Sequence, residues 1–176
     1  MRRIAHGIDR FSDISGKIVA WTALALVLIQ FAIVVMRYVF GVSSIFVQES
    51  LLYLFATLYM LGAAYTLRHN GHVRVDVFYR EAKARWKAWV DFFGVLLLLF
   101  PMCFMVWSTG WSYVAASWAV HEGSRETSGI QAVYLLKTEI LIFAAMMALQ
   151  GVALGLHSLL VLIGRETLST EQAPRL

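Results

Sequence analysis

The stretch that decides the fold is IVAWTALALVLIQFAIVVM, residues 18–36, which contains no charged residue. A helix needs about 20 apolar residues to cross the hydrocarbon core of a bilayer. The rest of the chain has the same character, because its 176 residues are 60% hydrophobic and only 15% charged, with a mean hydropathy of +0.69. This composition indicates an integral membrane protein.

Three further stretches also lack Asp, Glu, Lys and Arg, namely residues 50–67, 92–121 and 140–164. We therefore predict an all-α integral membrane protein with four transmembrane helices plus interfacial amphipathic helices. The predicted spans lie near residues 17–37, 48–67, 89–113 and 134–163. They form a membrane domain over 17–165, which lies between a cytoplasmic interfacial segment (1–16) and a cytoplasmic tail (166–176).

The basic residues predict the orientation of the chain. Twelve of the 15 Lys and Arg residues lie in the N-terminal segment, in the 68–88 loop or in the tail, and the other three are Arg37, Arg125 and Lys137. Because Lys and Arg are retained in the cytoplasm during insertion, both termini are expected there. The net charge of +4 then favours contact with anionic lipids and gives no support to nucleic-acid binding.

Two amphipathic stretches flank the predicted spans. The N-terminal segment contains Asp9 and Asp13 and has no small-residue cleavage site, so we expect it to be retained and not removed as a secretion signal. Apolar residues recur in it at helical spacing, which predicts a helix on the inner membrane surface. The same spacing predicts an interfacial helix that leads into the third span, with one face formed by Phe78, Ala82, Trp86, Trp89 and Phe93.

Ionisable residues deep in a bilayer usually mark a substrate or ion pathway. The ionisable groups in or beside these spans fall near span ends, where long side chains can reach water. For four of them on the predicted outer side a second interpretation stays open, in which partly buried ion pairs fix the helix register or contact a partner subunit. These four residues are Arg37, Glu49, Lys137 and Glu139.

The histidines and the cysteine give little support to a cofactor or metal. His157 lies alone in an apolar span, whereas haem between helices generally needs two axial ligands, so a hydrogen bond to a neighbouring helix or a position at the inner interface is favoured. His69 and His72 have a spacing that could suit zinc, but the adjacent arginines would repel a cation. Cys103 cannot form an intramolecular disulfide, because it is the single cysteine. We predict no enzyme activity, no cofactor and no catalytic, substrate-binding or metal-binding residues.

Small residues predict close helix packing. Gly151, Gly155 and Ser158 form a stripe along the last span, which could pack within this subunit or against another. Gly62, Ala63 and Ala64 have the same property near the end of the second span. Pro101 is expected to bend the third span, because proline removes a backbone donor.

A charged turn follows the second span. Asn70-Gly71 supplies a chain reversal. Asp76 is the one acid among Arg68, Arg74 and Arg80, which suggests a clamp that shapes the turn; a solvated basic loop without specific pairing is the alternative.

The sequence resembles a known family at these residues. The run LGAAYTLRHNGHVRVDVFY, residues 61–79, is similar to the most recognisable segment of the small permease subunits of tripartite ATP-independent periplasmic (TRAP) transporters, the DctQ family. Its motif residues here are Arg68, Gly71, His72, Arg74 and Asp76. The resemblance extends to RYVFGVSS (37–44), to EGSRETSG (122–129) and to ALQG (148–151). Phe46, Val47, Gln48 and the single Glu49 stand where many relatives have Trp and paired acids.

The resemblance implies a small scaffold subunit in the bacterial inner membrane. It would work with a large TRAP permease subunit and a periplasmic substrate-binding protein in symport, in which an ion gradient drives the uptake of organic acids. The segments EGSRETSG and YLLKTEI (134–140) are similar to the branch associated with mannitol or chloroaromatic compounds. Two alternatives are an autonomous small exporter that dimerises through Gly151 and Gly155, and a cytochrome-like membrane anchor subunit.

The predicted topology can be tested by labelling. A cysteine introduced at Asn70 of the Cys103→Ser background should not react with an impermeant maleimide added to intact cells, and it should react after the inner membrane is opened. A cysteine at Ser43, in the first predicted outer loop, is the matched control and should be labelled in intact cells. Labelling of a cysteine at position 70 in intact cells would show that the topology is the reverse of the one predicted.

Overall fold

Residues 1–72 and 82–164 are described here in a computed structural model of the chain, in which every regular element is helical. Four continuous helices are long and apolar enough to cross a membrane, which confirms the predicted fold class. Two of them contain a wider π-helical turn. In chain order the elements are α1 (Arg2–Val39), α2 (Ile45–Ala56), η1 (Thr57–Leu61), α3 (Gly62–Arg68), α4 (Ala84–Gly94), η2 (Val95–Leu99), α5 (Phe100–Ala119) and α6 (Val133–Leu162).

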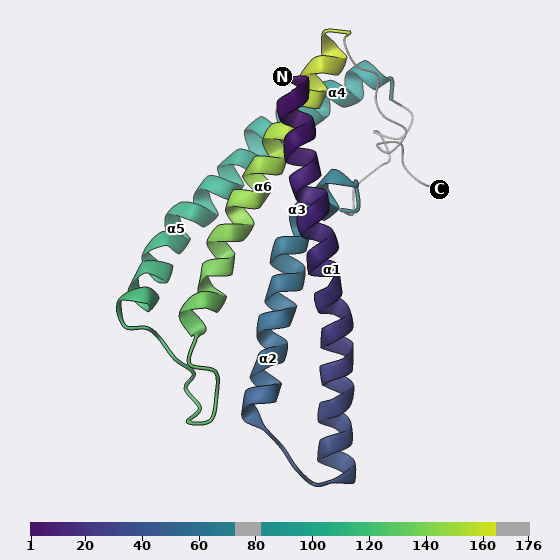
Figure 1. Ribbon diagram of the computed structural model, residues 1–176. Helices are drawn as coiled ribbons and strands as arrows, with labels where there is room; N and C mark the ends of the chain where they lie inside the picture. Colours follow the sequence, from purple (N-terminus) through teal and green to yellow (C-terminus); the bar gives the residue numbers. More distant parts are fainter. Residues whose placement is uncertain (73–81, 165–176) are drawn as a thin grey trace.

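The helices form two antiparallel pairs. Figure 1 shows α1 beside α2 and α5 beside α6, with the two pairs close together near the N-terminus and further apart toward the loops at the opposite end. Helix α6 packs against α1, α3, α4 and α5, so it is the central element of the bundle. The protein is therefore held together mainly along α6 and the N-terminal half of α1.

The second and first membrane-spanning helices end at residues that tolerate a left-handed backbone conformation. Asn70 has a φ of 53°, a left-handed conformation that asparagine tolerates, and the Gly71 N–H donates to the Thr66 carbonyl at 2.9 Å. The chain thus turns where the Asn-Gly pair predicted a reversal. After α1, Gly41 has a φ of 66°, and only glycine adopts this region without a steric penalty.

The third helix accommodates its proline with a π-helical turn. Pro101 lies in the first turn of α5, immediately after η2. Proline has no N–H to donate to the preceding turn, and a π-helical turn is one of the ways in which a helix absorbs such a missing hydrogen bond. The continuous helix from Ala84 to Ala119 also shows that the described part of the predicted interfacial stretch runs directly into the third span.

The N-terminal segment is the beginning of α1 and not a separate element. Its buried residues recur on one face, and they are Ala5, Asp9, Ser12, Gly16 and Val19. The apolar side chains that predicted an interfacial helix point away from the bundle, since Ile4 is 61% and Phe11 53% exposed. The start of this helix therefore turns small residues and the polar side chains of Asp9 and Ser12 inward, while most of its large apolar side chains and its basic side chains are exposed.

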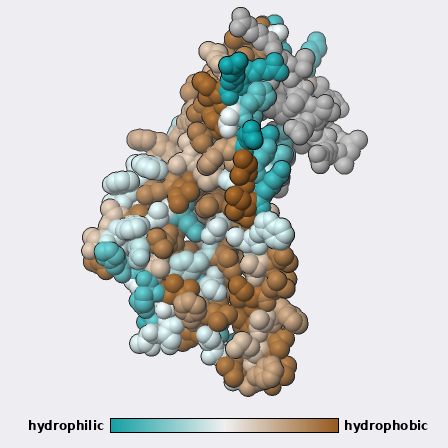
Figure 2. All heavy atoms as spheres, viewed as in Figure 1, coloured by the Kyte–Doolittle hydropathy of each residue, from teal (hydrophilic) through white to brown (hydrophobic). Residues whose placement is uncertain are grey.

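Much of the remaining surface is apolar as well. Exposed large side chains include Trp21, Leu98 and Phe104, each more than two-thirds exposed. Figure 2 shows hydrophobic residues over much of the helix surface, with hydrophilic residues gathered toward the end that holds the N-terminus. Such a surface suits lipid, because hydrocarbon gives no reason to hide apolar side chains.

Small residues allow the closest helix contacts. A Cβ on Gly16 would lie 2.3 Å from the Tyr65 ring, and a Cβ on Gly151 would lie 2.7 Å from Leu99 Cδ2. Gly155 is looser, with Val95 at 3.9 Å. Gly151 and Gly155 on α6 therefore face η2 and the start of α5 in the same chain, and packing of the stripe against another subunit stays a prediction.

The contact at Gly16 gives a stability prediction. Gly16→Ala should destabilise the protein by about 1 to 3 kcal/mol, because the new methyl group would collide with the base of the Tyr65 ring. Gly7→Ala is the matched control on the same helix, since nothing lies within 4 Å of that position. The control should be neutral or stabilising by about 0.5 to 1 kcal/mol, because alanine favours a helix. Thermal unfolding in detergent measures both variants, and equal effects would contradict the close contact.

Candidate functional site: polar clusters at the two ends of the bundle

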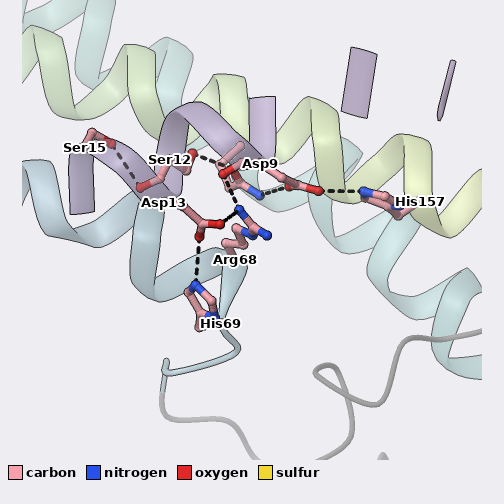
Figure 3. A network of polar contacts seen from close by, with 8 residues as sticks. Asp9, Ser12, Asp13, Ser15, Arg68, His69 and His157 are labelled. Atoms are coloured by element: carbon pink, nitrogen blue, oxygen red, sulfur yellow. Dashed lines mark hydrogen bonds and ion pairs between the residues drawn. The ribbon is translucent and has the colours of Figure 1, made fainter. Parts of the chain in front are cut away.

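A buried carboxylate lies at the centre of the first cluster. Asp9 on α1 is only 8% exposed, and its Oδ2 lies 2.9 Å from Nε2 of His157 on α6. Its Oδ1 accepts a hydrogen bond from Nε2 of Gln150 at 3.0 Å, and Oε1 of Gln150 accepts one from the Ser12 hydroxyl at 2.6 Å. Four side chains from two helices thus satisfy one another, as Figure 3 shows.

The end of α3 joins the same cluster. The Arg68 guanidinium donates to the backbone carbonyl of Asp9 and forms an ion pair with Asp13. The other oxygen of Asp13 lies 3.0 Å from Nε2 of His69. We call the seven residues the N-terminal polar cluster: Asp9, Ser12, Asp13, Arg68, His69, Gln150 and His157.

This cluster fixes how three helices meet. A buried charge without a partner is costly, and removing one partner of a buried pair is more harmful than never forming the pair. The carboxylate of Asp9 therefore ties α1 to α6, while that of Asp13 ties α1 to α3. The arrangement restrains the rotation and the register of α1 relative to both partners.

Only part of this cluster could be recognised from the sequence. His157 was expected either to bond a neighbouring helix or to reach the interface, and it bonds α1 through Asp9. Arg68, one of the three arginines around Asp76 in the sequence, forms an ion pair with Asp13, and its relation to Asp76 stays a prediction because Asp76 lies outside the described residues. Asp9, Ser12, Asp13 and Gln150 were not identified as site residues. One sequence clue was available, because Gln150 and His157 lie seven residues apart and so share one face of an otherwise apolar helix.

The second cluster lies at the opposite end of the bundle. Glu49 in α2 accepts hydrogen bonds from the Ser124 hydroxyl and from the Ile130 backbone N–H, the latter at 2.6 Å. Both donors belong to the loop between α5 and α6. A Cβ on Gly129 would lie 2.5 Å from Oε2 of Glu49, so this loop folds closely over the carboxylate. The motif EGSRETSG is therefore organised around Glu49.

Lys137 and Glu122 form an ion pair beside this loop, with 2.5 Å between Nζ and Oε2. The hydrogen bond from Lys137 holds the pKa of the Glu122 carboxyl below its usual value. The pair is consequently charged near neutral pH, and its contribution is lost only as the pH falls through that lowered pKa. Nζ of Lys137 also lies 4.0 Å from the centre of the Tyr113 ring.

The Glu139 side chain of α6 contacts the second membrane-spanning helix at a point further from the loop. Its Oε1 accepts a hydrogen bond from the Thr57 hydroxyl at 2.7 Å, in the π-helical turn η1. We use the name loop polar cluster for the residues at this end of the bundle together with the Glu139–Thr57 contact, which lies near the middle of the second helix: Glu49, Thr57, Glu122, Ser124, Lys137 and Glu139. Of the four residues with two open interpretations, three make internal contacts here, and Arg37 lies exposed in the last turn of α1.

The remaining predicted residues lie outside these clusters. His72 is exposed just after the turn, and His69 binds Asp13, so the two histidines do not share a ligand position. Gly71 is part of the turn itself. Arg74, Asp76 and Arg80 lie outside the described residues, and the proposed clamp at those positions stays a prediction.

These features define a four-helix integral membrane protein whose helices are joined by polar contacts at both ends. Comparison with known proteins gives its family. The profile described as "Tripartite ATP-independent periplasmic transporters, DctQ component" matches residues 26–161. The chain belongs to the DctQ family, which is a family of transporter components and not of enzymes.

One relative is the C4-dicarboxylate TRAP transporter small permease protein DctQ of Vibrio cholerae serotype O1 (strain ATCC 39315 / El Tor Inaba N16961). The two sequences are 32% identical over 79 residues, which is 44% of this chain and 34% of the relative. The aligned region thus spans about a third of the relative's own length. No solved structure matches the chain.

The contact between Asp9 and His157 can be measured with a double-mutant cycle. Asp9→Ala should destabilise the protein by about 1 to 3 kcal/mol, because it removes the carboxylate that accepts hydrogen bonds from the His157 ring and the buried Gln150 amide. Combined with His157→Ala, it should show a coupling energy of about 0.5 to 2 kcal/mol. Arg10→Ala is the control, as Arg10 is exposed beside Asp9. Additive effects of the two substitutions would show that the pair does not join the helices.

Proposed function

We propose that this chain is the small scaffold subunit of a bacterial TRAP transporter. It works with a large permease subunit and a periplasmic substrate-binding protein, and an ion gradient drives the uptake of organic acids. Membership of the DctQ family supports this role. The name of the Vibrio cholerae relative mentions C4-dicarboxylates, which favours organic acids as the transported class.

One structural observation carries the scaffold role. Each ionisable side chain of the N-terminal and loop polar clusters has at least one partner within this chain, and among their carboxylate oxygens Oε2 of Glu139 is buried without one in the described structure. A substrate site for a carboxylate needs donors that face a cavity, typically near the bilayer midplane. Here the polar groups serve helix packing, while the apolar surface in Figure 2 is suited to lipid and to a larger membrane partner.

The proposed placement in the membrane follows the basic residues. Residues 1–16 lie at the cytoplasmic face of the inner membrane, residues 17–165 form the membrane domain, and residues 166–176 form a cytoplasmic tail. The N-terminal polar cluster is then near the cytoplasm, and the loop polar cluster faces the periplasm. This orientation puts the folded EGSRETSG loop on the side of the binding protein.

The two alternative functions find less support. A dimeric exporter was suggested by Gly151 and Gly155, but those glycines pack against the third helix of the same chain. A cytochrome-like anchor would need two axial histidines on opposite faces of a haem, whereas the rings of His6 and His157 meet edge to face with 5.5 Å between their centres, which leaves no room for a haem between them.

Transport measurements test the proposal. Cells that express all three components should take up a radiolabelled C4-dicarboxylate such as succinate, and deletion of this chain should abolish the uptake. Isothermal titration of the purified chain with succinate should show no saturable binding, because the chain supplies no site for it. The control variant is Gly7→Ala, which should restore uptake fully when it is expressed in the deletion strain, because nothing lies within 4 Å of that position. Uptake by this chain alone in proteoliposomes would overturn the scaffold role and establish an autonomous carrier.

A further inference from the structure

Three metal-ligating side chains converge at the edge of the N-terminal polar cluster. His6 and Asp9 lie one helical turn apart on α1, and His157 faces them from α6. Each offers one ligand atom, and the three atoms all lie within 4.8 Å of one another. The rings of His6 and His157 meet edge to face, with 5.5 Å between their centres. Within residues 1–72 and 82–164, this is the group of His, Cys, Asp and Glu side chains that comes close enough to share an ion.

From this geometry we propose that His6, Asp9 and His157 form a binding site for a divalent transition-metal ion of the zinc type. Two imidazoles and one carboxylate are a donor set that zinc and its neighbours in the first transition row accept, whereas magnesium and calcium prefer oxygen ligands. Three protein ligands leave a fourth tetrahedral position. Because His6 is exposed, that position faces the surface and takes a water molecule.

The distances require only a small adjustment. Two donors that each lie about 2.0 to 2.1 Å from a tetrahedral zinc ion are separated by about 3.4 Å. Nε2 of His157 and Oδ2 of Asp9 are now 2.9 Å apart, so they must separate by a few tenths of an ångström. When the ion binds, Nε2 of His157 becomes a ligand and the imidazole carries its proton on Nδ1. The rotamer of the exposed His6 side chain supplies the remaining movement.

The surroundings support the carboxylate as a ligand. Gln150 donates to Oδ1 of Asp9 and leaves Oδ2 directed toward His157, so the amide orients the carboxylate. Hydrogen bonds of this kind from outside the ligand set raise metal affinity. Among the nearby cations, Arg68 binds the backbone carbonyl of Asp9 and is paired with the carboxylate of Asp13, which offsets its charge. Arg2, Arg3 and Arg10 lie within one turn of His6 on α1 and are exposed, so solvent screens their charge.

An ion at this position would join α1 to α6, the first and the last of the described helices. His6 and Asp9 belong to the first turns of α1, and His157 to the last turns of α6. Metal bound there would stabilise the folded protein, since a ligand that prefers the folded state raises its stability. The inference is independent of the proposed role in transport, because it concerns only contacts within this chain.

Metal binding can be measured directly on the full chain. The protein is purified in detergent with a tag that contains no histidine, stripped with EDTA, and titrated with zinc sulfate in competition with a chromophoric chelator. We expect one equivalent of zinc per chain. His6→Ala should bind at least about tenfold more weakly, because even partners outside the ligand set contribute roughly 10- to 100-fold to affinity. His72→Ala and His121→Ala are matched controls at exposed histidines and should bind like the unmodified protein.

A second measurement separates a lost ligand from a lost fold. Zinc should raise the thermal unfolding midpoint of the unmodified protein and of both controls, and should leave that of His6→Ala and His6→Gln unchanged. Cobalt should give the visible absorption of a tetrahedral ion only in proteins that retain His6. The proposal is overturned if the unmodified chain binds no zinc at micromolar concentrations, if both His6 variants bind as well as it does, or if His72→Ala weakens binding equally.

Discussion

The carboxylate of Asp9 is the group on which the helix arrangement most depends. It is buried between two helices, and it has hydrogen bonds from His157 and Gln150 that replace water. In lipid the hydrophobic effect does not drive helices together, so packing of small residues and polar contacts must do it. Both kinds of contact join α1 to α3 close to Asp9. Gly16 of α1 lets the Tyr65 ring of α3 approach closely, and Asp13 of α1 forms an ion pair with Arg68 at the end of α3.

In the loop polar cluster, too, polar contacts connect the helices, but here a folded loop supplies part of the hydrogen-bond donors. Glu49 organises a loop by accepting from a hydroxyl and a backbone N–H, and Lys137 neutralises Glu122 next to it. The helix pairs in Figure 1 are further apart at this end, so side chains and a folded loop connect them where helix backbones do not come close. EGSRETSG, one of the stretches that resembles the DctQ family, forms part of this loop.

The fold could be predicted from the sequence because it depends on long uncharged stretches, and these are visible without any knowledge of contacts. The turn at Asn70 was also predictable, since its chemistry is local. The N-terminal polar cluster was not, because its members lie up to 148 residues apart and each is unremarkable alone. Asp9 and Asp13 looked like residues of a solvated segment, and the helical spacing of Ile4, Ile8, Phe11 and Ile14 suggested that the polar face would meet water. The structure places that polar face against α6 and the apolar face outward, which periodicity alone cannot decide. Gly16 was missed for a similar reason, because its role depends on the aromatic ring that crosses it.

The distance along the chain between Asp9 and its partners also has a consequence for biosynthesis. Synthesis proceeds from the N-terminus, so Asp9 leaves the ribosome long before Gln150 and His157 are made. During this interval the first helix carries an acid whose final partners do not yet exist, and its N-terminal turns have reason to stay at the aqueous interface. Arrival of the last helix ends that interval and completes the packing of α1, which also contacts α2 and α3. Completion of the bundle is thus coupled to completion of the chain, and a product truncated before α6 would keep an unpaired acid by which quality-control proteases could distinguish it from the finished protein.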